Sequence, residues 1–226
     1  GMPDNFVRSV VEDINHNMWI GNNNGGVTRL IREKAPERLS GYDYTIQNFS
    51  KSRGFISDKV YTIISDRSGN LWFCTEGGLA RLLMPVPFLV PEGESLPNLM
   101  FHKYNISDGM ISERVRTIYE DSRGIFWIAY VGGKVQKLSV NMGDLVFHPD
   151  EFRHEFLDDF NTYAIHEDKM GHMWFGTEAG IVQFSLNDTT QALANPVIIT
   201  IKEGLAHNDI RSITEDKEGN LWIGTV

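Results

Sequence analysis

The chain has a single cysteine, Cys74, among its 226 residues, and it has no long apolar run. One cysteine excludes an intramolecular disulfide and says little about the redox compartment. No stretch approaches 18 uninterrupted apolar residues, so no membrane span is expected. The formal net charge is −9 and no basic run offsets it, so no nucleic-acid partner is expected. The first residues lead almost at once into an expected strand without signal-peptide features, which indicates a piece of a longer protein.

Signatures of catalysis are scarce as well. The seven histidines show neither H-x-x-x-H nor H-E-x-x-H spacing, so no metal site is predicted. The sequence has no G-x-S-x-G elbow and no P-loop. Glycoside hydrolysis would need a pair of carboxylates facing a cleft. The aspartates that could supply such a pair recur in every repeat, which fits turn capping better. No catalytic residue and no cofactor are therefore predicted.

What the chain does have is one motif written five times, and each copy holds one of the five tryptophans. Each tryptophan follows an aspartate by six residues, and the period is about 47 to 55 residues, which is typical of a repeat architecture such as a β-propeller. The pairs are Asp13 and Trp19, Asp66 and Trp72, Asp121 and Trp127, Asp168 and Trp174, and Asp216 and Trp222.

The second repeat shows how one unit forms a blade. Short stretches rich in β-branched and aromatic residues, at 60–64, 71–75, 79–82 and 100–104, predict four antiparallel strands. Turns at 66–70 and 76–78, with aspartate and glycine, separate the first three. The sequence thus predicts an all-β fold, a β-propeller of about four and a half four-stranded blades. The blades are expected at 6–50, 58–105, 113–157 and 160–202, with a partial blade at 208–226.

Recurrence assigns structural roles to the tryptophans and aspartates. We expect each tryptophan to pack between neighbouring blades and each aspartate to bond the backbone of its turn. Two residues after each tryptophan the chain holds a small residue, so Cys74 is interpreted as a buried small hydrophobe. The five are Gly21, Cys74, Ala129, Gly176 and Gly224. The turn glycine of the other units is His16 in the first. It must either adopt a costly left-handed conformation or change the loop, and a modified turn is expected there.

The best binding candidates lie on the first strand of each unit, which lines the central channel of a propeller. Arginine and tyrosine alternate there irregularly and offer bidentate donors and stacking faces for sugars or carboxylates. The alternative is that the arginine stems cover neighbouring blades and pair with nearby acids. Tyr130 is a secondary candidate, standing where other units place threonine or asparagine. The first-strand candidates are Arg8, Tyr61, Arg116, Tyr163 and Arg211.

The repeat I-x-E-D-x-x-G-N-L-W-I-G-T, most complete at residues 213–225, resembles the two-component regulator propeller repeat. The connecting segments G-F-I-S-D-K-V from Gly54 and G-M-I-S-E-R-V from Gly109 resemble that family too. The resemblance extends over all five units. It implies a periplasmic sensor region, often built as two seven-bladed rings, followed by a β-sandwich, a membrane helix and a histidine kinase. The chain would then be part of a larger, seven-bladed ring.

The resemblance favours a non-catalytic sensor that recognises a glycan-derived ligand such as an oligosaccharide. Its partners would be the remaining blades and the downstream signalling domains. Alternatives are a propeller enzyme of the polysaccharide or antibiotic lyase type, the sensor region of a diguanylate cyclase, or a scaffold without a small ligand. A half blade leaves an unpaired edge and uncovered apolar faces, so a homodimer is also expected unless further blades cover them.

Overall fold

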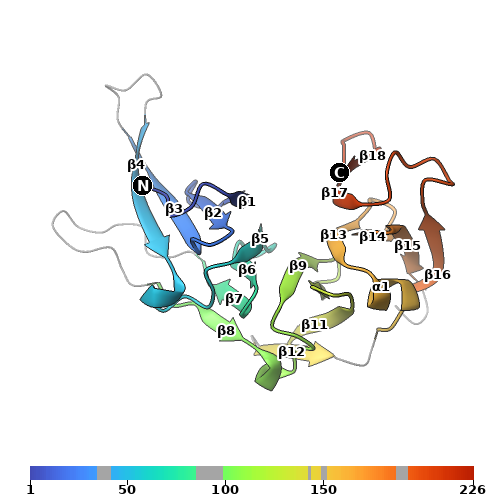
Figure 1. Ribbon diagram of the computed structural model, residues 1–226, viewed down its shortest axis with the longest axis horizontal. Coiled ribbons are helices and arrows are strands. Elements are labelled where there is room, and N and C mark those ends of the chain that lie inside the picture. The colour runs from blue at the N-terminus through green and yellow to red at the C-terminus, as the bar shows by residue number, and fades with distance from the viewer. Residues whose placement is uncertain (35–41, 85–98, 142–143, 149–151, 187–192) are drawn as a thin grey trace. The chain divides into compact units, whose positions relative to one another are not determined.

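The computed structural model describes residues 1–34, 42–84, 99–141, 144–148, 152–186 and 193–226. These residues form four four-stranded antiparallel sheets and one two-stranded sheet, with the strands of every sheet in chain order (Figure 1). The helical segments in the described part are two 3-10 turns and the helix α1 (Glu155–Asp159). The predicted all-β fold of propeller blades is confirmed.

The strand bounds follow the repeats. The first sheet contains β1 (Val7–Glu12), β2 (Met18–Asn22), β3 (Val27–Lys34) and β4 (Tyr42–Phe49). The second contains β5 (Val60–Ser65), β6 (Leu71–Thr75), β7 (Gly78–Leu82) and β8 (His102–Tyr104). The third contains β9 (Val115–Glu120), β10 (Phe126–Tyr130), β11 (Val135–Asn141) and β12 (Asp144–His148). The fourth contains β13 (Thr162–Glu167), β14 (Met173–Thr177), β15 (Gly180–Leu186) and β16 (Leu193–Ile199), and the fifth contains β17 (Ile210–Glu215) and β18 (Leu221–Thr225).

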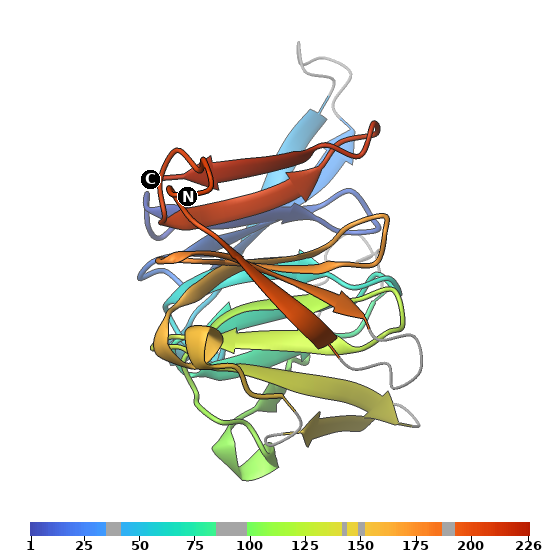
Figure 2. The ribbon, with the colours of Figure 1, turned by 90° about the vertical axis from the view of Figure 1, so that its right-hand side faces the viewer.

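The third repeat departs from its expected extent. Its outermost strand, β12, ends at His148, whereas the sequence placed the blade at 113–157. The end of that span enters α1, which lies in the connection between the third and fourth sheets (Figure 2). Leu157 of α1 is buried in the core that Trp127 and Phe175 share. The connection between these sheets therefore contributes to this core through α1.

The chain divides into two compact units. Unit 1 comprises Gly1–Asp108 and Ser112–Val115, and unit 2 comprises Gly109–Ile111 and Arg116–Val226. Each has a core between its own sheets. In unit 1 the ring of Trp19 lies edge-on to Phe73 of the next sheet at 5.6 Å and is stacked on Phe49 at 5.8 Å. In unit 2 Trp127 meets Phe175 edge-on at 6.0 Å.

The aspartate of each repeat holds both the turn and the tryptophan. In the second sheet Oδ1 of Asp66 accepts the Asn70 N–H at 2.8 Å, and Oδ2 accepts the indole N–H of Trp72 at 2.9 Å. The same two bonds occur in all five units, with indole distances of 2.8–3.0 Å. The predicted bond from each aspartate to its turn backbone is confirmed. The indole bond explains the fixed spacing of six residues, because one carboxylate must reach both donors.

How deeply each tryptophan is buried depends on whether a neighbouring sheet covers it. Trp19, Trp72 and Trp127 are fully buried, as expected of residues packed between blades. Trp174 is partly exposed, and Trp222 is 64% exposed. Trp222 keeps its bond to Asp216 at 2.8 Å. Trp222 therefore keeps the same position in the motif. It is exposed because no sheet among the described strands covers it.

Two of the small residues after the tryptophans, Gly21 and Gly176, face the first strand of the next sheet. A Cβ added at Gly21 would lie 2.9 Å from a methyl of Val60, and one at Gly176 would lie 2.7 Å from a methyl of Ile210. Cys74 occupies this position in the second sheet and is completely buried. Burial raises the pKa of its thiol, so the thiolate is disfavoured. The interpretation of Cys74 as a small buried hydrophobe is confirmed.

The expected modification of the first turn is wrong. His16 adopts the left-handed conformation, with φ of 62°, in the place of the turn glycine. The turn closes as in the second unit, with Asp13 N–H donating to Asn17 and His16 N–H donating to Asp13, both at 2.9 Å. Nδ1 of His16 lies 2.6 Å from a carboxylate oxygen of Glu12. The turn and its bonds to Asp13 thus outweigh the cost of a left-handed non-glycine residue, which is about 1–2 kcal/mol.

Candidate functional site

The first-strand candidates stand at β-bulges. In the first sheet Val7 pairs with Asn22 and Ser9 pairs with Gly21, so Arg8 is an extra residue without a partner in the ladder. The same one-residue shift occurs at Tyr61, Tyr163 and Arg211. A bulge bends its strand and re-aims a side chain, and bulges are frequent beside binding sites. Arg116 holds the equivalent second position of β9.

The first two strands of each sheet are antiparallel, so the start of the first strand lies beside the end of the second. Each bulge is therefore at the same end of its sheet as the turn that follows the second strand. This brings the bulge residue close to the residue that follows the second strand. Nε and Nη2 of Arg8 donate to Oδ1 of Asn23 at 2.8 and 2.6 Å. The tyrosine hydroxyls donate to carboxylates instead, Tyr61 to Glu76 at 3.5 Å and Tyr163 to Glu178 at 3.2 Å. The residue after the second strand therefore offers an acceptor to the bulge residue: an amide oxygen for Arg8, and a carboxylate for Tyr61 and Tyr163.

In unit 1 these contacts form a cluster of five residues, which we call the unit 1 cluster: Arg8, Lys59, Tyr61, Glu76 and Arg114. The guanidinium carbon of Arg8 lies 5.6 Å, and Nζ of Lys59 lies 5.4 Å, from the centre of the Tyr61 ring. The Glu76 carboxylate lies 3.5 Å from Nζ of Lys59 and 3.7 Å from Nε of Arg114. One carboxylate therefore serves two cations and a hydroxyl.

In unit 2 the corresponding group is the unit 2 cluster: Arg116, Tyr163, Glu178, Asp209 and Arg211. The guanidinium carbons of Arg211 and Arg116 lie 4.0 and 5.0 Å from the centre of the Tyr163 ring. Nη2 of Arg211 also donates to Asp209 at 2.6 Å. The cations that contact the ring compete with any sugar for its faces. Tyr163 thus orders the two arginines more than it offers a stacking platform.

The electrostatics of the unit 2 cluster keep its tyrosine neutral and its carboxylate charged. Burial, together with the charge of Glu178, raises the pKa of the Tyr163 hydroxyl, and the charge of Arg211 opposes this only in part. Burial would raise the pKa of Glu178, but hydrogen bonds from Asn161 and Tyr163 and the charge of Arg211 outweigh it and lower that pKa. The hydroxyl therefore remains a donor and Glu178 remains its acceptor.

The clusters suit recognition of oxygen-rich groups. Guanidinium, ammonium and hydroxyl donors converge at one end of each sheet, and such donors bind sugar hydroxyls, carboxylates and sulfates. The carboxylates present are tied to those same donors. In the unit 2 cluster, Glu178 accepts from Tyr163 and Asp209 accepts from Arg211.

Tyr130 is dropped from the candidate site. It is buried, with 1% of its surface exposed, and its hydroxyl donates to Gln136. Gln136 donates in turn to the carbonyl of Gly109 at 2.8 Å. Tyr130 therefore fixes the connection between two blades and presents no surface to a ligand. Its place at the end of β10 gave no sign of this in the sequence.

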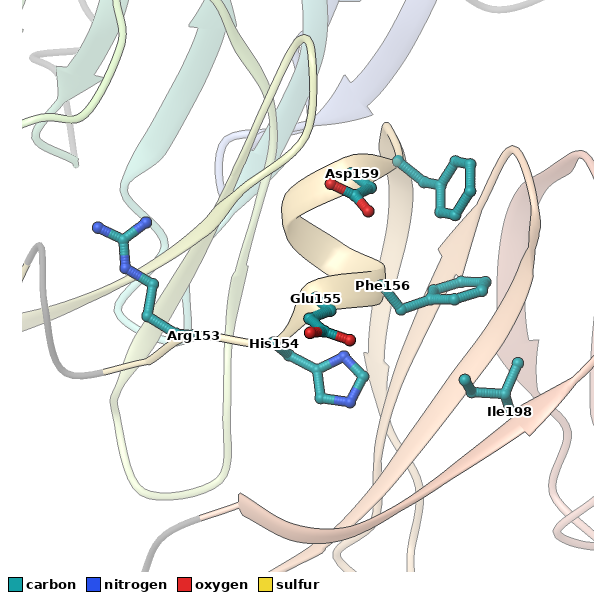
Figure 3. A pocket seen from close by; sticks show the side chains of 7 residues that line it. Arg153, His154, Glu155, Phe156, Asp159 and Ile198 are labelled. Carbon is teal, nitrogen blue, oxygen red and sulfur yellow. The ribbon is translucent and has the colours of Figure 1, made fainter.

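A separate hollow of about 560 Å³ lies beside α1 and was not predicted from the sequence. Figure 3 shows Phe156 extending from α1 toward the same space as Ile198 of β16, with the carboxylates of Glu155 and Asp159 on the helix. The guanidinium of Arg153 points away from the helix. The polar groups of this hollow do not converge, so the clusters are the better candidate. The lining residues are Arg153, His154, Glu155, Phe156, Asp159, Phe160 and Ile198.

Among the described residues, no group of three histidine, cysteine, aspartate or glutamate side chains is arranged to hold a metal ion. No helix in this part of the chain reaches the length and apolarity that a membrane crossing needs.

Four segments of the chain match the family described as two component regulator propeller: residues 1–24, 54–77, 109–132 and 204–226. They leave out the fourth unit, although its Asp168 makes the usual turn and indole bonds. The connection into that unit forms α1 and lacks the I-S sequence found before the second and third units. No curated protein is similar enough in sequence to count as a relative.

Solved propellers resemble the whole chain. The extracellular domain assigned to a hybrid two component system of B. thetaiotaomicron is 22% identical with a TM-score of 0.68, over 97% of this chain and 26% of that one. A second such domain from B. thetaiotaomicron is 25% identical with a TM-score of 0.55, over 99% of this chain and 32% of that one. Virginiamycin B lyase of Staphylococcus aureus, in a catalytically inactive variant, is 13% identical with a TM-score of 0.61, over 98% and 64%. The chain thus spans about a quarter to a third of the two-component domains, and the lyase shows the fold alone.

Proposed function

Because four of its five units are two component regulator propeller repeats, we propose that the chain is the ligand-recognition part of an extracytoplasmic sensor. Its ligand is a glycan-derived molecule, and the propeller itself performs no catalysis. The location is periplasmic, since the two-component domains that it resembles are extracellular. Further blades and a downstream signalling domain of the histidine kinase type belong to the same protein in this proposal.

The observation that carries the proposal is the position of arginine and tyrosine at the bulges. A side chain at a bulge takes no part in strand pairing, and Arg8 and Arg211 are exposed there. Donors of this kind, repeated at one end of successive sheets, are suited to a ligand with several oxygen atoms. The tryptophans Trp19, Trp72 and Trp127, by contrast, are buried and donate their indole N–H to an aspartate.

Binding by isothermal titration calorimetry against a panel of oligosaccharides tests this function. The informative variant is Arg211→Gln, which shortens the side chain and removes its charge. We expect it to weaken the binding of a panel member by about tenfold or more, since hydrogen bonds to charged groups are among the stronger ones. Arg53→Gln is the matched control, because Arg53 is an exposed arginine in the short turn Lys51–Arg53.

The melting temperature should be the same for both variants. A panel without any bound member, or equal affinity for Arg211→Gln and the parent chain, contradicts the proposal. Loss of binding together with a large fall in melting temperature would assign Arg211 to packing, which also contradicts it.

The second candidate is a lyase, favoured by the similarity to virginiamycin B lyase in fold. One solved form of that enzyme is a catalytically inactive variant in which a histidine is replaced by alanine. Neither cluster of this chain contains a histidine, which favours the sensor. Mass spectrometry of each bound oligosaccharide or antibiotic ester after incubation separates the two functions. An unchanged ligand supports the sensor, and a cleaved one supports the lyase.

A further inference from the structure

The unit 1 cluster carries a surplus of positive charge, in a chain whose net charge is −9. The cluster has three cations and the single carboxylate of Glu76, which contacts Lys59 and Arg114, whereas Arg8 contacts the Tyr61 ring. The unit 2 cluster is balanced by comparison, because Arg116 and Arg211 share it with Glu178 and Asp209. The surplus is therefore local to unit 1 and does not follow from composition.

Two carboxylates near this cluster in sequence, those of Asp58 and Asp4, accept hydrogen bonds from backbone groups. Oδ1 of Asp58 accepts the Lys51 N–H at 2.7 Å. Asp4 accepts the N–H groups of Phe6 at 3.0 Å and Asn24 at 2.8 Å, and the bond from Phe6 is the main cause that lowers the pKa of Asp4. Both residues hold loops in place, and among the described residues neither forms an ion pair with the three cations.

Arg8 has a neutral partner. Its two donors share Oδ1 of Asn23, and among the described residues no carboxylate forms an ion pair with it. Its guanidinium is exposed and lies over the Tyr61 ring, which Lys59 also contacts. Two cations thus contact one buried aromatic ring, and 30% of the Lys59 side chain is exposed. An anion within reach of both cations would be attracted by both.

We propose that the ligand bears an anionic group, a carboxylate or a sulfate on a sugar, and that Arg8 and Lys59 bind this group. This rests on the proposed function and specifies its ligand class. The planar guanidinium of Arg8 offers two parallel donors that match either anion, and they exchange the Asn23 oxygen for it. Lys59 adds a point charge, and its bond to Glu76 keeps the ammonium above the Tyr61 ring.

Calorimetry with matched sugar pairs tests the proposal. One arm compares an oligogalacturonide with its carboxyl-reduced, neutral counterpart, and the other compares a sulfated disaccharide with its desulfated form. We expect the anionic member of one pair to bind about tenfold or more tightly than the neutral member. The arm that shows this difference identifies the anion as carboxylate or sulfate. Raising the salt concentration should weaken only the anionic member.

The variants Lys59→Met and Arg8→Gln locate the effect. Each should reduce affinity for the anionic sugar about tenfold and leave the neutral sugar unaffected. Lys217→Met is the control, because Lys217 is exposed in the turn between β17 and β18, at the opposite end of its sheet from the bulge. Two variants are used so that a loss of folding in one does not decide the result.

The outcomes separate this proposal from the one on which it rests. Equal binding of the anionic and neutral members, or full affinity in both variants, overturns the anionic ligand while glycan recognition stands. Absence of binding by every sugar overturns both. Weaker binding in Lys59→Met and in Lys217→Met alike would assign the effect to net charge and would also overturn the site.

Discussion

Replacing Asp66 with alanine should destabilise the chain far more than the same change at Asp216. Asp66 accepts the Asn70 N–H and the indole N–H of Trp72, and Trp72 is completely buried. The substitution leaves both donors without an acceptor. An unsatisfied buried group costs about 1–3 kcal/mol, so the two donors together cost about 2–6 kcal/mol. This is a large part of the total stability of a typical domain, about 5–15 kcal/mol.

Urea unfolding, followed by tryptophan fluorescence and circular dichroism, measures the loss. Asp66→Asn should lie between the parent chain and Asp66→Ala, because the amide oxygen still accepts one of the two donors. Asp216→Ala removes the same two bonds at Trp222, which is 64% exposed. Water replaces the carboxylate there, so the effect should be clearly smaller.

Adding Trp72→Phe to Asp66→Ala provides the internal check. Phenylalanine has no indole N–H, so this second change should cost less in the Asp66→Ala background than in the parent chain. Equal losses at Asp66 and Asp216, or additive effects of the two changes at Asp66 and Trp72, would refute the argument that the buried indole bond makes this aspartate important.

Four further outcomes are expected. Hydrogen bonds from Trp222 and Asn220 lower the pKa of Asp216 from 3.8 to about 2, so its stabilising effect is complete above about pH 4 and is lost as the pH falls through 2; an NMR titration midpoint near 3.8 would contradict this. Gly176→Ala places a methyl 2.7 Å from Ile210 and should cost about 1–3 kcal/mol in urea unfolding, whereas no change would show that the sheets move apart freely. His16→Gly should stabilise the chain by about 1 kcal/mol, since it removes a left-handed non-glycine residue and only an exposed contact to Glu12; a lower urea midpoint would show that this contact dominates. Sedimentation of the isolated 226-residue piece at micromolar concentration should show a homodimer, because the apolar sheet face bearing Trp222 is uncovered without further blades. A monomer at all concentrations would contradict this.

The parts of the fold that the sequence predicts are those that depend on residue type and spacing. The tryptophan period gives the sheets, and the aspartate six residues earlier gives the turn, because only a short acceptor at that distance reaches the turn backbone. The small residues predict close approach of the next sheet, which Gly176 and Ile210 show. These features depend on local chemistry, so the same residues recur in each repeat and predict the same structure.

Strand register and backbone conformation are harder to predict from the sequence than the presence of the strands and turns. A bulge adds one residue to a strand without altering its composition, so Tyr61 looks like any other strand residue in the sequence. The left-handed conformation of His16 depends on the competition between the turn and the backbone penalty. The helix α1 has five residues, too few to show helical periodicity. The sequence therefore identified the bulge residues as candidates but could not predict their contacts with the turn residues.

The bulge also explains how one scaffold can present different side chains for binding. Residues such as Trp72 and Asp66 are fixed by contacts on every side, and a change in either disturbs packing. A residue at a bulge is extra to the ladder, so arginine or tyrosine fits without altering the pairing of its neighbours. The turn residue after the second strand then adapts, as an amide beside Arg8 and a carboxylate beside Tyr61. Variation at these two positions changes which ligand an end of the sheet can bind, while the pairing of the strands stays the same. For this reason Arg8→Gln is expected to change the affinity for a ligand and not the stability of the fold.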